Sequence, residues 1–291
     1  KLRLHAQPTA RSFAAWSFPT TQEGWEAIRA MYQEGLRPAV CRLYDPFDAM
    51  LARQGAVKRE KKAKKASSPG KGGALLRSLL RRPGMLNKLI DAAGSNLLGG
   101  AMLLVIFEGT GDEPGRACDR AKALVGGRGG RFEGEGPAQK WLQHRYSVSY
   151  RQAPAFAQGA WVDTMEVAAP WSRLGAMYDG VRKALGEHVF VMAHFSHAYP
   201  DGCCIYFTFA GSAATDGGPD WNAASTTTYD RTWRAALQAL LDAGGTIAHH
   251  HGVGRSKAPR LRDELGAGVD VFRALKRAFD PSGIFNPGAL L

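Results

Sequence analysis

SFAAWSFPTTQEGWEAIRAMYQEGLRPAVCRLYD, residues 12–45, contains the pattern that decides the fold. Its first seven residues are mostly apolar and predict a buried strand. Thr20 followed by Glu23 three residues later is a capping-box pattern, which predicts the start of a helix. Apolar residues then recur on one helical face until Gly35, where we expect the helix to end. The last nine residues predict a second strand, so the stretch forms one strand–helix–strand unit.

The same alternation of strand and helix patterns continues along the chain. We therefore expect an α+β fold with ferredoxin-like strand–helix–strand units, in which helices pack on one face of an antiparallel or mixed sheet. The further strands are expected at 101–109, 161–170, 188–199 and 203–211, and the further helices at 112–127, 171–186 and 228–245.

The positive charge of the chain is concentrated in one segment. Nearly all of the formal net charge of +12 lies in residues 51–90. Within it, residues 55–73 are rich in Lys, Ser, Pro and Gly, and we expect a basic, mobile insert there. Residues 74–90 alternate leucine and arginine, so the segment is either a solvated linker with a surface helix or, over 58–90, a contact to an anionic membrane. No aromatic residues interleave the basic run, so nucleic acid is not expected as a partner.

The remaining composition is that of a globular protein. No apolar run is long enough for a membrane-spanning helix, and there is no signal-peptide pattern, so we expect a soluble, cytoplasmic protein that contacts membranes at most peripherally. The four cysteines have no metal-ligand spacing, and we interpret them as reduced and structural.

Three consecutive histidines, His249–His251, follow a short apolar run and precede Gly252 and Gly254. On an extended strand, His249 and His251 would share one face and His250 would point to the other. Two imidazoles on one face are too few for a metal site unless another strand contributes ligands, and three are too polar to be buried without a role. A catalytic or cofactor-facing cluster fits best, because imidazole changes charge near neutral pH.

These residues also carry a family resemblance. IAHHHGVGR (247–255), with FDPSGIFNPGALL (279–291) after it, resembles the C-terminal end of FAD-linked oxidases of the vanillyl-alcohol-oxidase type, in the branch of alkyldihydroxyacetonephosphate synthase. The segments at 17–45, VAAPW (167–171) and YPDGCCIYFTFAG (199–211) follow the family order. The resemblance therefore covers almost the whole chain apart from the basic insert.

The resemblance implies roles for particular residues. Tyr206 matches the family's catalytic tyrosine, a general base or acid. His249, His250 and His251 match the histidines around the substrate and the reactive edge of the flavin, and are expected to be catalytic. Arg42 matches an arginine that recognises the acidic or phosphorylated part of the substrate. The FAD cofactor is expected to contact His251, Gly252 and Asn286.

The resemblance also implies what this chain lacks. The related D-lactate and D-2-hydroxyglutarate dehydrogenases use a Glu and a His as metal ligands where this chain has His250 and Ile205, so we expect no bound metal. No segment resembles the FAD-binding domain. We therefore expect residues 1–11 to be the last strand of that domain, 12–291 to be the cap or substrate domain, and the isolated piece to be inactive and to bind FAD weakly or not at all.

Three functions remain open at this stage. The first is the substrate-binding part of an FAD-dependent, alkyldihydroxyacetonephosphate-synthase-like enzyme, a transferase of ether-lipid synthesis that exchanges an acyl chain for a fatty alcohol. The second is an FAD-dependent oxidase or dehydrogenase of a 2-hydroxy acid or alcohol. The third is a non-catalytic lipid- or partner-binding domain. In each case we expect a lipid or small-molecule ligand and a homodimer.

Overall fold

A computed structural model describes residues 2, 4, 6–57, 78–147, 153–156, 159–212 and 219–290. The chain divides into two compact units, each built from segments that are distant in the sequence. Unit 1 comprises Lys1–Pro69, Lys88–Pro154 and Met192–Asp201, and unit 2 comprises Gly70–Asn87, Ala155–Val191 and Gly202–Leu291. The basic insert predicted at 55–73 lies outside the described residues from position 58 onward, and helix α2 (Pro46–Val57) includes its first three residues.

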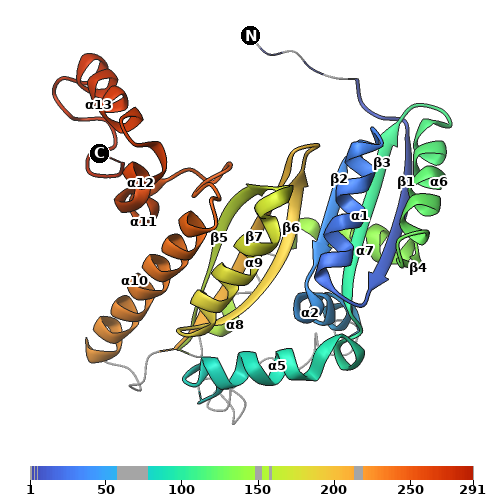
Figure 1. The fold of residues 1–291 in the computed structure, drawn as a ribbon, viewed down its shortest axis with the longest axis horizontal. Helices are drawn as coiled ribbons and strands as arrows, with labels where there is room; N and C mark the ends of the chain where they lie inside the picture. Colours follow the sequence, from blue (N-terminus) through green and yellow to red (C-terminus); the bar gives the residue numbers. More distant parts are fainter. Residues whose placement is uncertain are drawn as a thin grey trace. The chain divides into compact units, whose positions relative to one another are not determined.

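Unit 1 is an antiparallel sheet with helices (Figure 1). Its strands lie in the order β4-β1-β3-β2-β6, and each strand pairs antiparallel with its neighbours in this order. The elements are β1 (Ala10–Phe18), α1 (Thr21–Gln33), β2 (Val40–Tyr44), α2, α5 (Pro83–Leu98), β3 (Ala101–Gly109), α6 (Glu113–Gly126), β4 (Arg131–Gly134), α7 (Gly136–His144), a 3-10 turn (Arg145–Ser147), α8 (Ala153–Phe156) and β6 (Phe190–Ala198). Of these, α5, α8 and β6 each have residues in both units.

The predicted capping box begins helix α1. Thr20 Oγ1 accepts a hydrogen bond from the Glu23 amide at 3.2 Å, and the Glu23 carboxylate accepts one from the Thr20 amide at 2.9 Å. The apolar face of this helix, with Trp25 and Ile28, is buried. On another part of the sheet, Ala15 and its neighbours form a core cluster with residues of α2 and α7. The second half of strand β1, from Ala14 to Phe18, is buried.

Unit 2 is built around the β5–β7 pair and contains the C-terminal helices. Its elements are β5 (Trp161–Pro170), α9 (Trp171–Gly186), β7 (Gly202–Gly211), α10 (Pro219–Asp242), α11 (Gly254–Lys257), a 3-10 turn (Ala258–Arg260), α12 (Leu261–Leu265) and α13 (Gly268–Phe279). Strands β5 and β7 pair antiparallel over their whole length, from Trp161↔Gly211 to Pro170↔Gly202.

The two faces of the β5–β7 pair differ in character. On one face, Tyr178 of α9 stacks on Phe207 and Trp233 of α10 meets Phe209 edge to face, with ring centroids 6.1 and 5.9 Å apart. Because side chains alternate along a strand, Tyr206 belongs to the opposite face. The helix-covered face is the core of the unit, which leaves the other face free to carry polar side chains.

The structure confirms the predicted α+β class, with helices packed on antiparallel strands. Strands β3 and β5 and helix α9 have the predicted bounds, whereas α10 begins at Pro219 rather than near residue 228. All four cysteines are free and buried. No helix among the described residues combines the length and the apolar character needed to cross a bilayer.

Candidate functional site

The histidine triplet lies beside strand β5, but it is not at the end of a strand. Between helices α10 and α11 the backbone makes a single bridge, Thr246↔Ala168, and then turns through a series of bends. The prediction that His250 points away from His249 and His251 is therefore wrong, because it assumed an extended backbone. The three rings instead form a row, with centroids 5.1 Å apart for His249 and His250 and 4.7 Å apart for His250 and His251.

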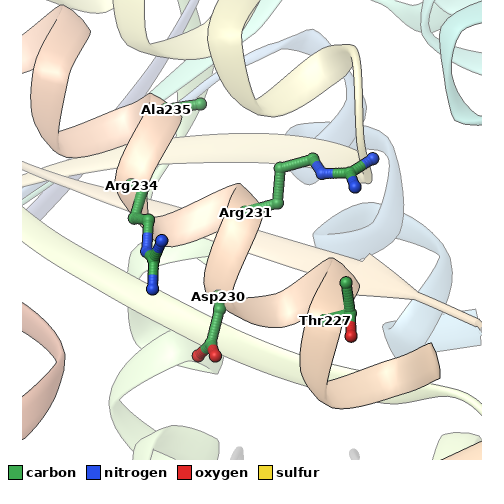
Figure 2. Close-up of a pocket in the computed structure, with 5 residues that line it drawn as sticks. All are labelled: Thr227, Asp230, Arg231, Arg234 and Ala235. Atoms are coloured by element: carbon green, nitrogen blue, oxygen red, sulfur yellow. The ribbon is translucent and has the colours of Figure 1, made fainter. Parts of the chain in front are cut away.

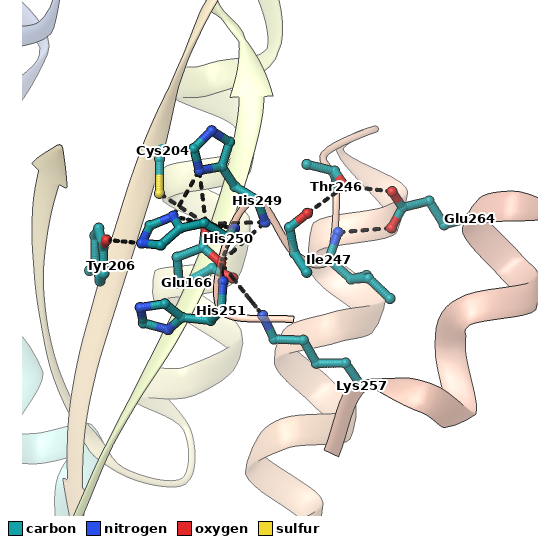
Figure 3. Close-up of polar contacts among 11 residues, drawn as sticks. Glu166, Cys204, Tyr206, Thr246, Ile247, His249, His250, His251, Lys257 and Glu264 are labelled. Carbon is teal, nitrogen blue, oxygen red and sulfur yellow. Dashed lines mark hydrogen bonds and ion pairs between the residues drawn. The ribbon is translucent and has the colours of Figure 1, made fainter. Parts of the chain in front are cut away.

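Tyr206 meets this row from strand β7. Its hydroxyl lies 2.6 Å from Nε2 of His250, and the ring of His251 stands edge-on to the phenol with centroids 5.3 Å apart (Figure 3). At the other nitrogen of the His250 ring, Nδ1 lies 2.8 Å from Nδ1 of His249. The structure thus brings together all four predicted catalytic residues: hydrogen bonds join Tyr206, His250 and His249, and His251 contacts the rings of Tyr206 and His250.

A fifth residue, Glu166, lies under the triplet. It is fully buried and pairs directly across from Tyr206. Its carboxylate accepts hydrogen bonds from the backbone amides of all three histidines, at 3.1 Å from His249, 3.3 Å from His250 and 3.2 Å from His251. One side chain therefore fixes the backbone of the whole triplet.

Buried partners surround this carboxylate. The Cys204 thiol donates to Glu166 Oε1 at 3.2 Å. The ammonium group of Lys257, itself buried, donates to the Glu166 backbone carbonyl at 2.8 Å and lies 3.9 Å from Oε2. A buried charge is tolerated when it is paired and hydrogen-bonded, and Glu166 meets both conditions.

These contacts set the charge states of the cluster. Burial alone would raise the pKa of Glu166, but the hydrogen bonds from Cys204 and the three amides outweigh it, and the pKa lies below its ordinary value. Burial and the nearby carboxylate raise the pKa of Cys204, which keeps the thiol protonated. Burial lowers the pKa of His251, which favours the neutral imidazole at neutral pH. The cluster therefore combines an ionised carboxylate with a neutral imidazole at His251.

The same atoms are close enough to be considered as metal ligands. One ligand atom from each of Glu166, Cys204, His249 and His250 lies within 4.8 Å of the others. Hydrogen bonds among these groups and from the backbone account for their positions, and the thiol is held in its protonated form. The expectation of a site without metal stays a prediction.

A second carboxylate holds the start of the segment. Glu264 of α12 accepts from the Thr246 hydroxyl at 2.5 Å and from the Ile247 amide at 2.8 Å (Figure 3). It anchors the same loop as Glu166, two residues before the triplet. Two buried or half-buried acids from different elements thus determine where the histidines lie.

Comparison with known proteins places this chain in a family. The family described as FAD linked oxidases, C-terminal domain, matches residues 7–290. The chain belongs to this FAD-linked oxidase family. It is 26% identical to the alkyldihydroxyacetonephosphate synthase of Trypanosoma brucei brucei, over 100% of this chain and 45% of that protein. The chain spans less than half of the length of this relative.

Solved structures show the same fold. A structure of alkyldihydroxyacetonephosphate synthase matches with a TM-score of 0.63 and 22% identity, over 97% of this chain and 45% of that one. The 4-ethylphenol oxidase of Gulosibacter chungangensis matches with a TM-score of 0.60 and 18% identity, over 99% of this chain and 55% of that one. A synthase and an oxidase thus share the fold of this FAD-linked oxidase domain.

The rim of the cluster has the chemistry to meet the FAD of this family. The side chains of His249 and His250 are 26% and 37% exposed, so their rings can donate to or accept from a bound group. Gly252 has a positive φ of 76°, and nothing lies within 4 Å of where a Cβ would stand, so backbone there is open to close approach. Among the described residues, no hydrogen bond joins Asn286, the third predicted cofactor contact, to the triplet; its carbonyl accepts from Ala289.

Arg42, the predicted substrate ligand, belongs to unit 1. Its Nη2 lies 2.7 Å from Nε2 of His194, and its guanidinium lies over the rings of Tyr44 and Trp141, 5.2 and 5.9 Å from their centroids. Burial and the guanidinium lower the pKa of His194, so the neutral imidazole accepts the hydrogen bond. Among the described residues the Arg42 Nε atom is buried without a hydrogen-bond partner. These contacts orient the guanidinium.

A surface pocket lies apart from these residues, along helix α10. It is lined by Thr227, Asp230, Arg231, Arg234 and Ala235 (Figure 2). The two arginines point in different directions and do not converge on one position. This pocket therefore gives no candidate site for the family's chemistry.

The sequence analysis missed the residues that support the triplet. Glu166 is the one charged residue in the run MEVAAP of β5, and a carboxylate within an apolar strand is the signal that could have identified it. Lys257 follows the motif by six residues and gives no comparable signal.

Proposed function

We propose that this chain is the substrate-binding part of an FAD-dependent enzyme that resembles alkyldihydroxyacetonephosphate synthase. Such an enzyme exchanges an acyl chain for a fatty alcohol in ether-lipid synthesis. The observation that carries the proposal is the 2.6 Å contact between the Tyr206 hydroxyl and His250 Nε2. It joins the predicted general base or acid to one of the histidines that the resemblance implies around the substrate and the flavin edge. The match to this synthase along the whole chain supports the choice of reaction.

The pair can take up a proton from a substrate carbon. When the Tyr206 hydroxyl donates to Nε2 of a neutral His250, its oxygen gains negative character and becomes a better base. A proton from the substrate's hydroxymethyl carbon can then pass to the phenol oxygen while the phenol proton passes to His250. His251 stands edge-on to the same phenol, and burial lowers its pKa, which favours the neutral imidazole.

FAD, when bound, would supply the electron-accepting ring that this family uses. We assign its contacts to His251, Gly252 and Asn286 of this chain, with the remaining contacts outside it. The role of these residues is to orient the ring edge and the substrate, and to restrict access by water.

Arg42 is proposed to hold the acidic or phosphorylated part of the substrate. A guanidinium presents a planar set of donors that matches phosphate and carboxylate oxygens. Its contact with His194 and its position over two aromatic rings keep the group from swinging freely. A substrate anion would accept hydrogen bonds from the Arg42 guanidinium.

The alternative is an FAD-dependent oxidase or dehydrogenase of a 2-hydroxy acid or alcohol. In that reaction Arg42 would hold a carboxylate and His251 would take the hydroxyl proton. Incubation of the full-length protein with acyl-dihydroxyacetone phosphate and labelled fatty alcohol separates the two. Incorporation of the label with no net flavin reduction is the expected result, whereas flavin reduction by a hydroxy acid alone, without exchange, favours the oxidase. The absence of both activities would favour a non-catalytic domain.

A peripheral membrane contact is proposed for the basic region. In α5, Met85 and Leu89 lie one turn apart and are 48% and 59% exposed. Asn87 between them is buried and bonds to the Gly186 and Val189 carbonyls at 3.2 and 2.9 Å, which fixes this part of the helix. Exposed apolar side chains among arginines and lysines are typical of helices at an anionic lipid surface. A long-chain lipid substrate would give such a contact a purpose.

A further inference from the structure

We infer that Glu166 is a positioning residue that sets the tautomer of His250, so that Nε2 of this ring accepts the proton of Tyr206. The inference rests on the proposed function in one respect, because the proposed proton transfer requires that Tyr206 donates its hydrogen bond to His250. It concerns a residue that touches neither substrate nor cofactor in the proposed reaction and acts through the triplet.

Glu166 first fixes the backbone from which the imidazoles project. A single carboxylate accepts from three successive amides, so the segment cannot rotate any one of these peptide groups without losing a hydrogen bond in a buried place. Side-chain position follows from backbone position, and the His250 ring is thereby directed at Tyr206. The cross-strand pairing of Glu166 with Tyr206 makes both ends of this arrangement part of the same two strands.

Glu166 also contacts the ring itself. Its Oε1 lies 3.3 Å from His250 Nδ1, and an ionised carboxylate can only accept. The proton of a neutral His250 is therefore favoured on Nδ1, where it also reaches His249 Nδ1 at 2.8 Å. A neutral imidazole has one N–H, so Nε2 is left with its lone pair. The hydroxyl 2.6 Å away must then be the donor.

The opposite tautomer would reverse the direction of the hydrogen bond between Tyr206 and His250. With the proton on Nε2, His250 would donate to the phenol oxygen, and its bare Nδ1 would face the carboxylate. Nε2 would then have no lone pair with which to accept the phenol proton. A carboxylate that orients an imidazole and selects its tautomer is the role of the acid in a catalytic triad. The same physical argument applies here to Glu166.

Glu264 provides a matched control. It also accepts a hydrogen bond from the backbone of this loop, at Ile247, but none of its hydrogen bonds or ion pairs among the described residues is to an imidazole. If Glu166 only held the loop in place, Glu166→Gln and Glu264→Gln would have similar consequences. If it sets the tautomer, only Glu166→Gln changes the ring.

The experiment is ¹⁵N spectroscopy of the full-length protein labelled at histidine, with the His250 signals assigned by comparison with His250→Ala. The wild type and Glu264→Gln are expected to show His250 protonated at Nδ1, and Glu166→Gln a shift toward Nε2–H. For exchange activity, Glu166→Gln is expected to lower kcat at least about 10-fold with little change in KM, since general-base catalysis contributes on the order of 10²-fold or more.

A wild-type His250 protonated at Nε2 would overturn the inference, and so would a Glu166→Gln protein with wild-type tautomer and kcat. If Glu166→Gln does not fold, the wild-type spectrum still decides. The spectrum requires neither flavin nor substrate. A protein with the expected tautomer but without exchange activity would therefore contradict the proposed function and leave the positioning role in place.

Discussion

Glu166 and Tyr206 lie directly opposite each other on β5 and β7, and His250 lies within hydrogen-bond or ion-pair distance of both. Directly opposite residues of an antiparallel pair project from the same face. The strand pairing therefore brings Glu166 and Tyr206 together, and the loop places the His250 imidazole in contact with both. The strands provide the rigid part of the candidate site, and the loop provides its reactive ring.

Lys257→Met should destabilise the protein. Lys257 is buried, and its ammonium group lies 3.9 Å from the Glu166 carboxylate. Removing one partner of a buried ion pair leaves an uncompensated charge, and the expected loss is about 3 kcal/mol in the free energy of unfolding. Urea denaturation of the wild type and the variant measures this loss. Lys140→Met, at an exposed position of α7, is the control. Equal stability of the two variants would show that Lys257 does not compensate Glu166.

The stability that Glu166 contributes should depend on pH. Because its pKa in the folded protein lies below the ordinary 4.5, the unfolded chain takes up a proton first as the pH falls. The contribution is fully present above about pH 4.5 and is lost as the pH falls through the lower folded pKa. The difference in unfolding free energy between the wild type and Glu166→Gln should therefore narrow below this pH. A difference that stays constant or widens there would show that the carboxylate is not stabilised by its ionised form.

Removal of metal ions should not affect the protein. The groups close enough to ligate a metal, Glu166, Cys204, His249 and His250, bond to one another and to backbone amides. Dialysis of the full-length protein against a chelator is expected to leave exchange activity and the thermal unfolding midpoint unchanged. Activity that disappears on dialysis and returns with Zn²⁺ would instead show that these side chains form a metal centre.

Substitutions in α5 should weaken binding to anionic vesicles. Met85→Ser with Leu89→Ser removes two exposed apolar side chains from a helix in the basic region. Sedimentation with phosphatidylserine vesicles should fall several-fold, because buried apolar area and charge both contribute to interfacial binding. Leu51→Ser, which removes an apolar side chain 39% exposed on α2, should have little effect. Sedimentation of the wild type that is equally weak with anionic and neutral vesicles would contradict a membrane contact.

Local rules of sequence predicted the strands and helices well and the site in part. The capping box at Thr20 and the bounds of β5 and α9 follow from patterns within one element. The orientation of His250 does not, because alternation applies to extended backbone and the triplet lies in bends. Glu166 bonds to amides more than eighty residues away along the chain. Such a partner is determined by strand pairing and loop packing, which no local pattern contains.

The most direct test of the central claim is the release of hydrogen isotope from the hydroxymethyl carbon of acyl-dihydroxyacetone phosphate by the full-length protein. We predict rapid release by the wild type and a loss on the order of 10²- to 10⁴-fold in Tyr206→Phe and in His250→Ala, since both residues are needed to move the proton. Tyr146→Phe, at a tyrosine 78% exposed, should release the label normally. Release that is unchanged in both site variants would contradict proton transfer by Tyr206 and His250.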